Sequence, residues 1–504
     1  MSKNHDIRIQ EVNDDSTYDH VIKYTGLFGG VQGLTMLMNV VRNMVTSKLL
    51  GPAGLGFINI FNKTTGLLNQ STNLGISMSA VKHIATLNEQ GDDSELCAFA
   101  HTVRSWTMLT AILGTLLCLV LAPLLSLWEF NDYSQLTSFI LLAPVVGIMS
   151  LTSGEMAILK GMKQLKKVAL ISVFTATATL LLSLPLYLYW GIGSIATALL
   201  ICSLAGLIIH LHYSTRIIPW SSSPFSRDIL RKGMPMIWLG IAFILAGVFG
   251  EAAALFIQTM IKNYGGIDDV GLYNCSYTLA ITSTSIAFVA MDADFFPRLA
   301  AAEHDVQRQN QTVNQQIEVC LILIVPCLIF FLTALPIIVP ILYSNEFLSV
   351  IPMVVYSSIF MLAKAFDLPI SYLALAKGDS RTYMVIELIF DVMIALLIPY
   401  AFRNWHLEGA GIALSFCGIV NLAIIYLAYR WKYKFRLHLI QVKTIVMQVL
   451  LYAAAFYISL HIDGWQRYVL GGLLLVLSAA LSFRVVKQET AIVQRLRNKF
   501  SRKK

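Results

Sequence analysis

Three basic side chains stand inside long apolar stretches of this sequence, where a charge is costly unless it has a partner. They are Arg42, Lys63 and Lys364. An arginine can hold a phosphate through two parallel N–H bonds, and a lysine acts as a point charge. We expect these cations to bind an anionic substrate or, alternatively, to pair with buried carboxylates and join helices.

Polar amides accompany the first two cations. In a helix of 3.6 residues per turn, Asn62, Asn69 and Asn73 share one face, with Lys63 and Gln70 beside it. This spacing predicts a polar stripe suited to a diphosphate and to sugar hydroxyls. The predicted substrate-binding residues are Arg42, Lys63, Asn39, Asn62, Asn69, Gln70 and Lys364.

Four acidic residues within apolar stretches are candidates for ion coupling: Glu251, Asp367, Glu387 and Asp391. Asp367 is three residues from Lys364, which permits a local ion pair. Glu251 has no basic neighbour in its own helix, so it could face Arg42 or Lys63 and compete with the substrate, or carry a proton. Glu387 and Asp391 are four residues apart, so a shared proton or cation would relieve their repulsion; the alternative is solvation near a cytoplasmic opening.

Motifs for catalysis are not found. No GxxxxGK[ST], HExxH or GxSxG occurs, so we expect no ATP-binding loop, no catalytic residue and no cofactor. Asp292 and Asp294 lie in an apolar span, and His210 and His212 lie at the end of one, so we expect no metal there. The seven cysteines stand singly without CxxC spacing, which predicts neither disulfides nor a metal site. The sequence therefore indicates no use of ATP.

The composition predicts an all-α polytopic membrane protein. Of 504 residues, 56% are hydrophobic and 13% charged, and the apolar residues form blocks long enough to cross a bilayer. We place fourteen transmembrane helices at 21–50, 55–87, 100–128, 136–160, 166–189, 191–213, 234–262, 270–300, 315–343, 347–376, 381–402, 406–430, 441–462 and 466–486.

The distribution of basic residues predicts the orientation. Most of the 37 Lys and Arg residues fall in connectors on one side, and only Lys48, Lys262, Arg403 and Arg467 fall on the other. By the positive-inside rule, both termini are cytoplasmic. Residues 1–20 are polar and do not resemble a signal peptide. This asymmetry accounts for the net charge of +8, so no nucleic-acid partner is expected.

Weak internal similarity at a shift of about 215 residues predicts a duplication. Gly56–Asn59 (GFIN) and Gly271–Asn274 (GLYN) open corresponding spans. Because six spans separate the copies, the halves keep the same orientation. The expected regions are 1–20 (cytoplasmic segment), 21–213 (first six-helix lobe), 214–233 (cytoplasmic linker), 234–430 (second six-helix lobe), 441–486 (two additional helices) and 487–504 (basic cytoplasmic tail).

Three short motifs in this order resemble one transporter superfamily. Gly51–Gly56 (GPAGLG) resembles the first periplasmic turn of Wzx-type flippases, which include the enterobacterial common antigen flippase. Phe296–Leu299 (FPRL) and Tyr372–Lys377 (YLALAK) resemble the ends of the eighth and tenth spans in the MOP exporter superfamily, to which those flippases belong in its polysaccharide-transport branch. The similarity extends to about residue 430.

The resemblance implies a flippase of the bacterial inner membrane with two helical lobes around a central cavity. Such proteins move an undecaprenyl-diphosphate-linked glycan from the cytoplasmic to the periplasmic leaflet, for O-antigen or similar surface polysaccharide. Membrane lipids, and the polymerase and chain-length proteins of the same pathway, are its implied partners. Two alternatives remain: a MATE-like cation or drug antiporter, which the buried basic residues disfavour, and a membrane-embedded polysaccharide polymerase or ligase, which the short periplasmic connectors disfavour.

Overall fold

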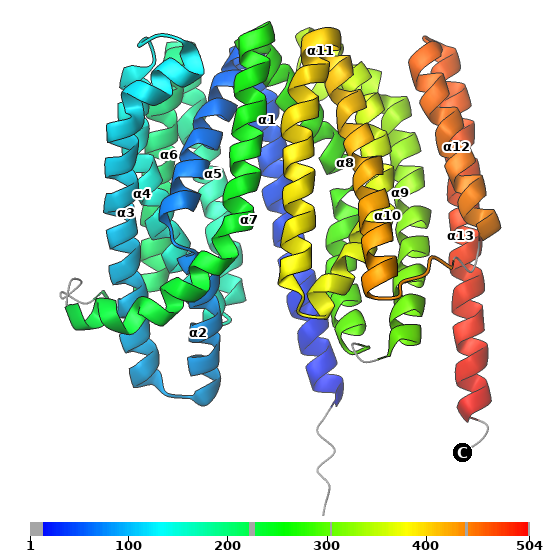
Figure 1. Ribbon diagram of the computed structural model, residues 1–504, viewed down its shortest axis with the longest axis horizontal. Coiled ribbons are helices and arrows are strands. Elements are labelled where there is room, and N and C mark those ends of the chain that lie inside the picture. The colour runs from blue at the N-terminus through cyan, green and yellow to red at the C-terminus, as the bar shows by residue number, and fades with distance from the viewer. Residues whose placement is uncertain (1–13, 221–226, 303–304, 439–441, 502–504) are drawn as a thin grey trace, which may run out of the picture.

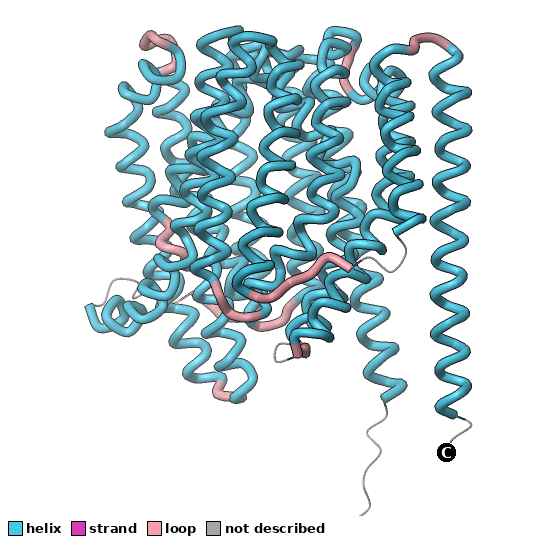
Figure 2. Tube along the Cα trace, turned by 45° about the vertical axis from the view of Figure 1, so that its right-hand side comes forward, coloured by secondary structure: helices cyan, strands magenta, loops and turns pink. Residues whose placement is uncertain are grey.

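Every regular element in the described part of the chain is a helix, which confirms the predicted all-α fold (Figures 1 and 2). The computed structural model describes residues 14–220, 227–302, 305–438 and 442–501. The helices are α1 (Asp14–Thr72), α2 (Ile76–Gln90), α3 (Asp93–Phe130), α4 (Leu136–Gly161), α5 (Leu165–Trp190), α6 (Ile195–Thr215), α7 (Arg227–Gly265), α8 (Ile267–Ala300), α9 (Val306–Leu342), α10 (Ile351–Ala376), α11 (Ser380–Lys432), α12 (Val442–His461) and α13 (Trp465–Ser501), with short 3-10 turns at Gly191–Ser194 and Asn345–Val350.

Two of these helices are interrupted where the sequence predicts a connector between spans. In α1 the backbone leaves helical geometry at Gly51, whose φ of 64° suits glycine, and Pro52 follows. In α11 the break falls at Trp405 and His406. The start of α1 and the end of α13 lie at the same end of the molecule, the lower end in Figure 1, and we call the opposite end the upper end.

Nine segments within the described residues are long and apolar enough to cross a membrane. Two of them, Leu165–Thr215 and Ser380–Lys432, have 51 and 53 residues, more than the roughly 20 that one crossing requires. The chain is therefore a multi-pass membrane protein, and the count of fourteen spans stays a prediction.

The predicted span at 55–87 is not one helix. It ends at Thr72 and resumes as α2 at Ile76, because Leu74 and Gly75 have left-handed φ values of 52° and 64°. Gly75 also lies against the backbone of α7: a Cβ there would be 2.2 Å from the carbonyl oxygen of Gly240. This close contact joins α2 to α7 near the lower end.

The helices gather on two sides of α1 and α7. The largest hydrophobic cluster is built mainly from α8 to α12 and the end of α7, and smaller clusters join α2 to α6 and part of α1. In Figure 1, α2–α6 lie on the left and α8–α13 on the right, with the first part of α1 and the upper part of α7 between them; the second part of α1 lies with the left-hand group. The upper part of α7 thus lies between the two groups, and the second part of α1 contacts α7.

Candidate substrate-binding site

The second part of α1 and α7 are joined by an ion pair between Lys63 and Glu251. The Lys63 Nζ donates a hydrogen bond to Glu251 Oε2 at 3.1 Å, and the two side chains are 34% and 32% exposed. Gly66 lies on the neighbouring turn, where a Cβ would be only 3.9 Å from Glu251 Oε2. Partial exposure lets a third charged group reach either partner.

Arg42 does not belong to this pair. It lies in the first part of α1, close enough to Tyr187 of α5 and Cys202 of α6 for electrostatic interaction. No hydrogen bond or ion pair links its guanidinium to the residues that the structure describes. Asn39, one turn earlier, is exposed. Among the described residues, no carboxylate therefore neutralises the positive charge of Arg42.

The amide side chains of the predicted stripe contact two different neighbours of α1, namely α4 and α7. Asn69 donates hydrogen bonds to Val146 O (3.2 Å) and Ser150 Oγ (2.9 Å) of α4. Asn73 donates to Ser153 Oγ of the same helix at 3.1 Å. Both donors thus hold α1 against α4.

Two amides remain on other faces of α1. The Gln70 amide packs on Gly247 of α7, where a Cβ would lie 2.7 Å from Nε2, and Gln70 Oε1 is buried without a hydrogen-bond donor. Asn62 is exposed. Gln70 is the amide that lies with Lys63 on the α7 side.

The predicted local ion pair in α10 is present. Lys364 Nζ lies 3.2 Å from Asp367 Oδ2, and Asp367 is only 3% exposed. Its two oxygens also accept hydrogen bonds from Ser371 Oγ at 2.8 Å and from Asn421 Nδ2 of α11 at 3.2 Å. Asp367 thus joins α10 to α11 and leaves Lys364 partly exposed.

The two acids of α11 face the same region. Glu387 interacts electrostatically with Lys364 and with Tyr383. The Asp391 carboxylate lies 3.6 Å from the position of a Cβ on Gly250, the residue before Glu251. These side chains therefore form two polar clusters, the Lys63–Glu251 pair between α1 and α7 and a group around Lys364 on α10 and α11. Within the described ranges, no three His, Cys, Asp or Glu residues are grouped to hold a metal.

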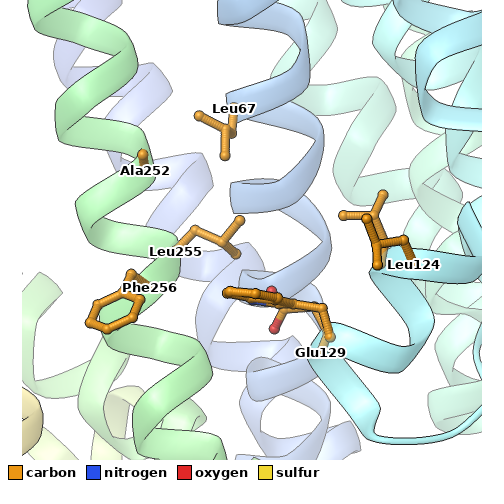
Figure 3. Close-up of a pocket in the computed structure, with 8 residues that line it drawn as sticks. Leu67, Leu124, Glu129, Ala252, Leu255 and Phe256 are labelled. Carbon is orange, nitrogen blue, oxygen red and sulfur yellow. The ribbon is translucent and has the colours of Figure 1, made fainter. Parts of the chain in front are cut away.

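An apolar groove lies on the same helices as the Lys63–Glu251 pair. It has a volume of about 380 Å³ and lies between α1, α3 and α7 (Figure 3). Leu67 and Leu255 in its lining follow Lys63 and Glu251 by one turn on their helices, although neither member of the ion pair lines the groove. Its lining is Leu67, Leu124, Leu125, Trp128, Glu129, Ala252, Leu255 and Phe256.

Two buried acids outside the predicted set also carry polar contacts. Glu129, at the end of α3, accepts a hydrogen bond from Thr259 of α7. Glu155 of α4 pairs with Arg104 of α3, which lies near the start of the predicted span 100–128. Glu155 lies within the predicted span 136–160, so the same sequence signal that pointed to Glu251 could have identified it.

Comparison with protein families gives one match. A family model described as polysaccharide biosynthesis protein matches residues 45–352. No curated protein sequence matches the chain.

Solved structures of the MOP superfamily share the fold. The lipid II flippase MurJ, in an inward closed conformation, has a TM-score of 0.73 at 13% identity, covering 92% of this chain and 99% of its own. An inward-facing multidrug resistance MATE transporter has a TM-score of 0.65 at 15% identity, covering 79% and 94%. A MOP superfamily transporter from Pyrococcus furiosus has a TM-score of 0.57 at 14% identity, covering 82% and 95%.

Proposed function

Because the chain belongs to the polysaccharide biosynthesis protein family, we propose that it is a Wzx-type flippase. Proteins of this family and fold are transporters and not enzymes, so the polymerase or ligase alternative falls away. Its substrate is an undecaprenyl-diphosphate-linked glycan, which it moves from the cytoplasmic to the periplasmic leaflet by alternating access. The glycan serves a surface polysaccharide, O-antigen or similar.

The observation that carries this proposal is the Lys63–Glu251 ion pair. A diphosphate is expensive to bury unless cations face it. The charge of Lys63 is already balanced by a carboxylate on another helix. The protein therefore stays folded when no substrate is bound. An arriving diphosphate takes the place of Glu251 on Lys63, and Glu251 returns when the head group leaves. This exchange keeps the attraction strong enough for entry and weak enough for release.

The predicted topology fits this cycle. Fourteen helices form two six-helix lobes, 21–213 and 234–430, with two further helices at 441–486, and both termini are cytoplasmic in the bacterial inner membrane. Gly56 and Gly271, which the internal repeat places in register, pack against each other where α1 crosses α8. The polymerase and chain-length proteins of the same pathway would receive the product.

One observation favours a second candidate, a MATE-like antiporter for cations. Glu251, Asp367, Glu387 and Asp391 outnumber Lys63 and Lys364 in the two polar clusters, and a surplus of acids attracts cations. The same surplus is compatible with a flippase if a proton or a metal cation shares the site with the substrate.

Reconstitution into liposomes tests the two candidates together. The full chain is incorporated with a polyprenyl-diphosphate-linked oligosaccharide, and a membrane-impermeant glycosidase measures how fast the glycan reaches the outer leaflet. The flippase predicts transfer faster than in protein-free liposomes, and no transfer above that background with Lys63→Ala. Efflux of a lipophilic cation without any glycan transfer would contradict the flippase and support the antiporter.

A further inference from the structure

Glu129 forms a contact between α3 and α7 at the upper end of the molecule. Its side chain is fully buried, and Thr259 Oγ1 lies 2.9 and 3.0 Å from its two carboxyl oxygens. In Figure 3, Glu129 extends from α3 at the edge of the apolar groove, with Leu255 and Phe256 of α7 on the other side. The residue has no part in the diphosphate exchange described above.

The surroundings of Glu129 are apolar apart from one nearby cation. Lys262, one turn after Thr259, faces it electrostatically, but its Nζ lies 5.2 Å from the Phe130 ring centroid and makes no hydrogen bond. Asp132, in the connector after α3, interacts with Lys262 rather than with Glu129. From α1 and α4, the rings of Phe57, Phe61 and Phe139 pack around Phe130.

A carboxylate in such a position lacks donors. One hydroxyl donor cannot replace the hydration of a negative charge, whereas a neutral carboxylic acid is satisfied by few partners. If α3 and α7 separate, water reaches Glu129 and the charged form becomes stable. The closed arrangement thus favours the protonated acid, and the open arrangement favours the carboxylate.

We propose that Glu129 is a proton-binding site that controls the opening of the upper end between α3 and α7. A proton taken from the solution on that side converts the carboxylate into the acid, and α3 closes on α7 with Thr259 donating to it. The proton returns to the same solution when the contact opens. Lys262 opposes protonation by its positive charge, so it sets the pH at which the contact closes.

This proposal rests on the proposed function only in requiring that the upper end opens during transport. The test therefore measures that opening directly, without substrate. Spin labels are attached at Tyr133→Cys and Asn263→Cys, two exposed positions on either side of the contact, in the full chain with its native cysteines replaced. Distance distributions are recorded in lipid nanodiscs between pH 5 and pH 9.

The expected result is a rise in the long-distance population with pH, by up to about tenfold per pH unit in the open-to-closed ratio, the limit for one proton. Glu129→Gln should stay closed at every pH. Lys262→Met should move the midpoint to higher pH, and Thr259→Val should favour opening, whereas Thr259→Ser keeps the hydroxyl and should behave as the parent. Glu346→Gln, an exposed carboxyl at the same end, is the control and should leave the pH response unchanged.

Two outcomes would overturn the proposal. One is a distance distribution in the parent protein that does not change with pH. The other is a pH response in Glu129→Gln equal to that of the parent. If Glu129→Gln does not fold, the opposite shifts expected of Lys262→Met and Thr259→Val decide the question, and their absence overturns it. A failure of glycan transfer in liposomes would leave all these distances unaffected, so it tests the proposed function separately.

Discussion

Arg104 of α3 and Glu155 of α4 form a two-point ion pair that is almost completely buried. Nε lies 2.9 Å from Oε1 and Nη2 donates to Oε2 at 3.1 Å, with both side chains 3% exposed. The guanidinium also donates to the carbonyl oxygens of Ile218 (2.9 Å) and Pro219 (3.0 Å), just after α6. This pair therefore fixes the start of the connector between α6 and α7.

Removing one partner of this pair should destabilise the protein strongly. Arg104→Ala leaves a buried carboxylate without its cation, which typically costs about 3–5 kcal/mol. We expect a much lower yield of folded protein in the membrane and a lower melting temperature in detergent. Lys163→Ala is the control, because Lys163 pairs with Glu89 at the surface, where the side chains are 61% and 66% exposed, and should change little. Equal effects of the two variants would contradict a structural role for the buried pair.

Removing the carboxylate that balances Lys63 should change substrate affinity and turnover in opposite directions. In Glu251→Gln, Lys63 has no competitor for the diphosphate, so the head group should bind more tightly and leave more slowly. Binding of a polyprenyl diphosphate to the purified protein, compared with transfer in liposomes, measures both. Lys63→Ala should weaken binding and abolish transfer while the protein still accumulates. Normal transfer by Lys63→Ala would mean that the pair only joins α1 to α7.

Arg42 should be more sensitive to conservative replacement than Lys63. If its guanidinium binds a phosphate through two N–H groups, a lysine cannot reproduce that geometry. We expect Arg42→Ala to abolish transfer, Arg42→Lys to retain little, and Lys63→Arg to retain part of the rate. Glycan transfer rates at equal protein content provide the comparison. Full activity in Arg42→Lys would exclude a two-point contact.

The positions of the helices follow from local properties of the sequence. Apolar blocks must become helices in a bilayer because no water is present to satisfy their backbone groups. The predicted connectors near Gly51 and residue 405 coincide with interruptions in α1 and α11. At Gly51 the cause is local, because a glycine with positive φ is followed by a proline. The break at Leu74 and Gly75 was not predicted, because it depends on the approach of Gly240 from a distant helix.

Polar contacts within one helix could likewise be predicted from the sequence, whereas those between distant helices could not. The Lys364–Asp367 pair could be predicted because both residues lie on one helix. Glu251 lies 188 residues from Lys63, so the sequence could name it only as one possible partner. Helical spacing placed Asn69 and Asn73 on one face but could not show that α4 covers that face.

Acidification should weaken a contact at the lower end between the α10–α11 connector and the end of α11. Hydrogen bonds from Lys432 and Tyr433 hold the pKa of the Asp379 carboxyl below its usual range. Because the folded-state pKa is lowered, the stabilisation is fully present above the unfolded value of about 3.9 and is lost as the pH falls through the folded-state value. Asp379→Asn should therefore lower the melting temperature at pH 7, and this difference from the parent should shrink below about pH 4. A difference that does not vary with pH would exclude this role of the charge.

A methyl group at Gly75 should be far more disruptive than one at Gly91. Both glycines have left-handed φ values, 64° and 75°, so alanine at either carries a similar backbone cost of about 1–2 kcal/mol. They differ in surroundings: a Cβ at Gly91 meets nothing within 4 Å, whereas one at Gly75 would lie 2.2 Å from Gly240 O. Gly75→Ala must therefore push α2 away from α7 at the lower end, in addition to the backbone cost. We expect a larger fall in melting temperature than for Gly91→Ala, and faster labelling of a cysteine placed at Met234, an exposed position near the start of α7. Equal melting temperatures and labelling rates in the two alanine variants would show that α2 and α7 are not held together by this contact.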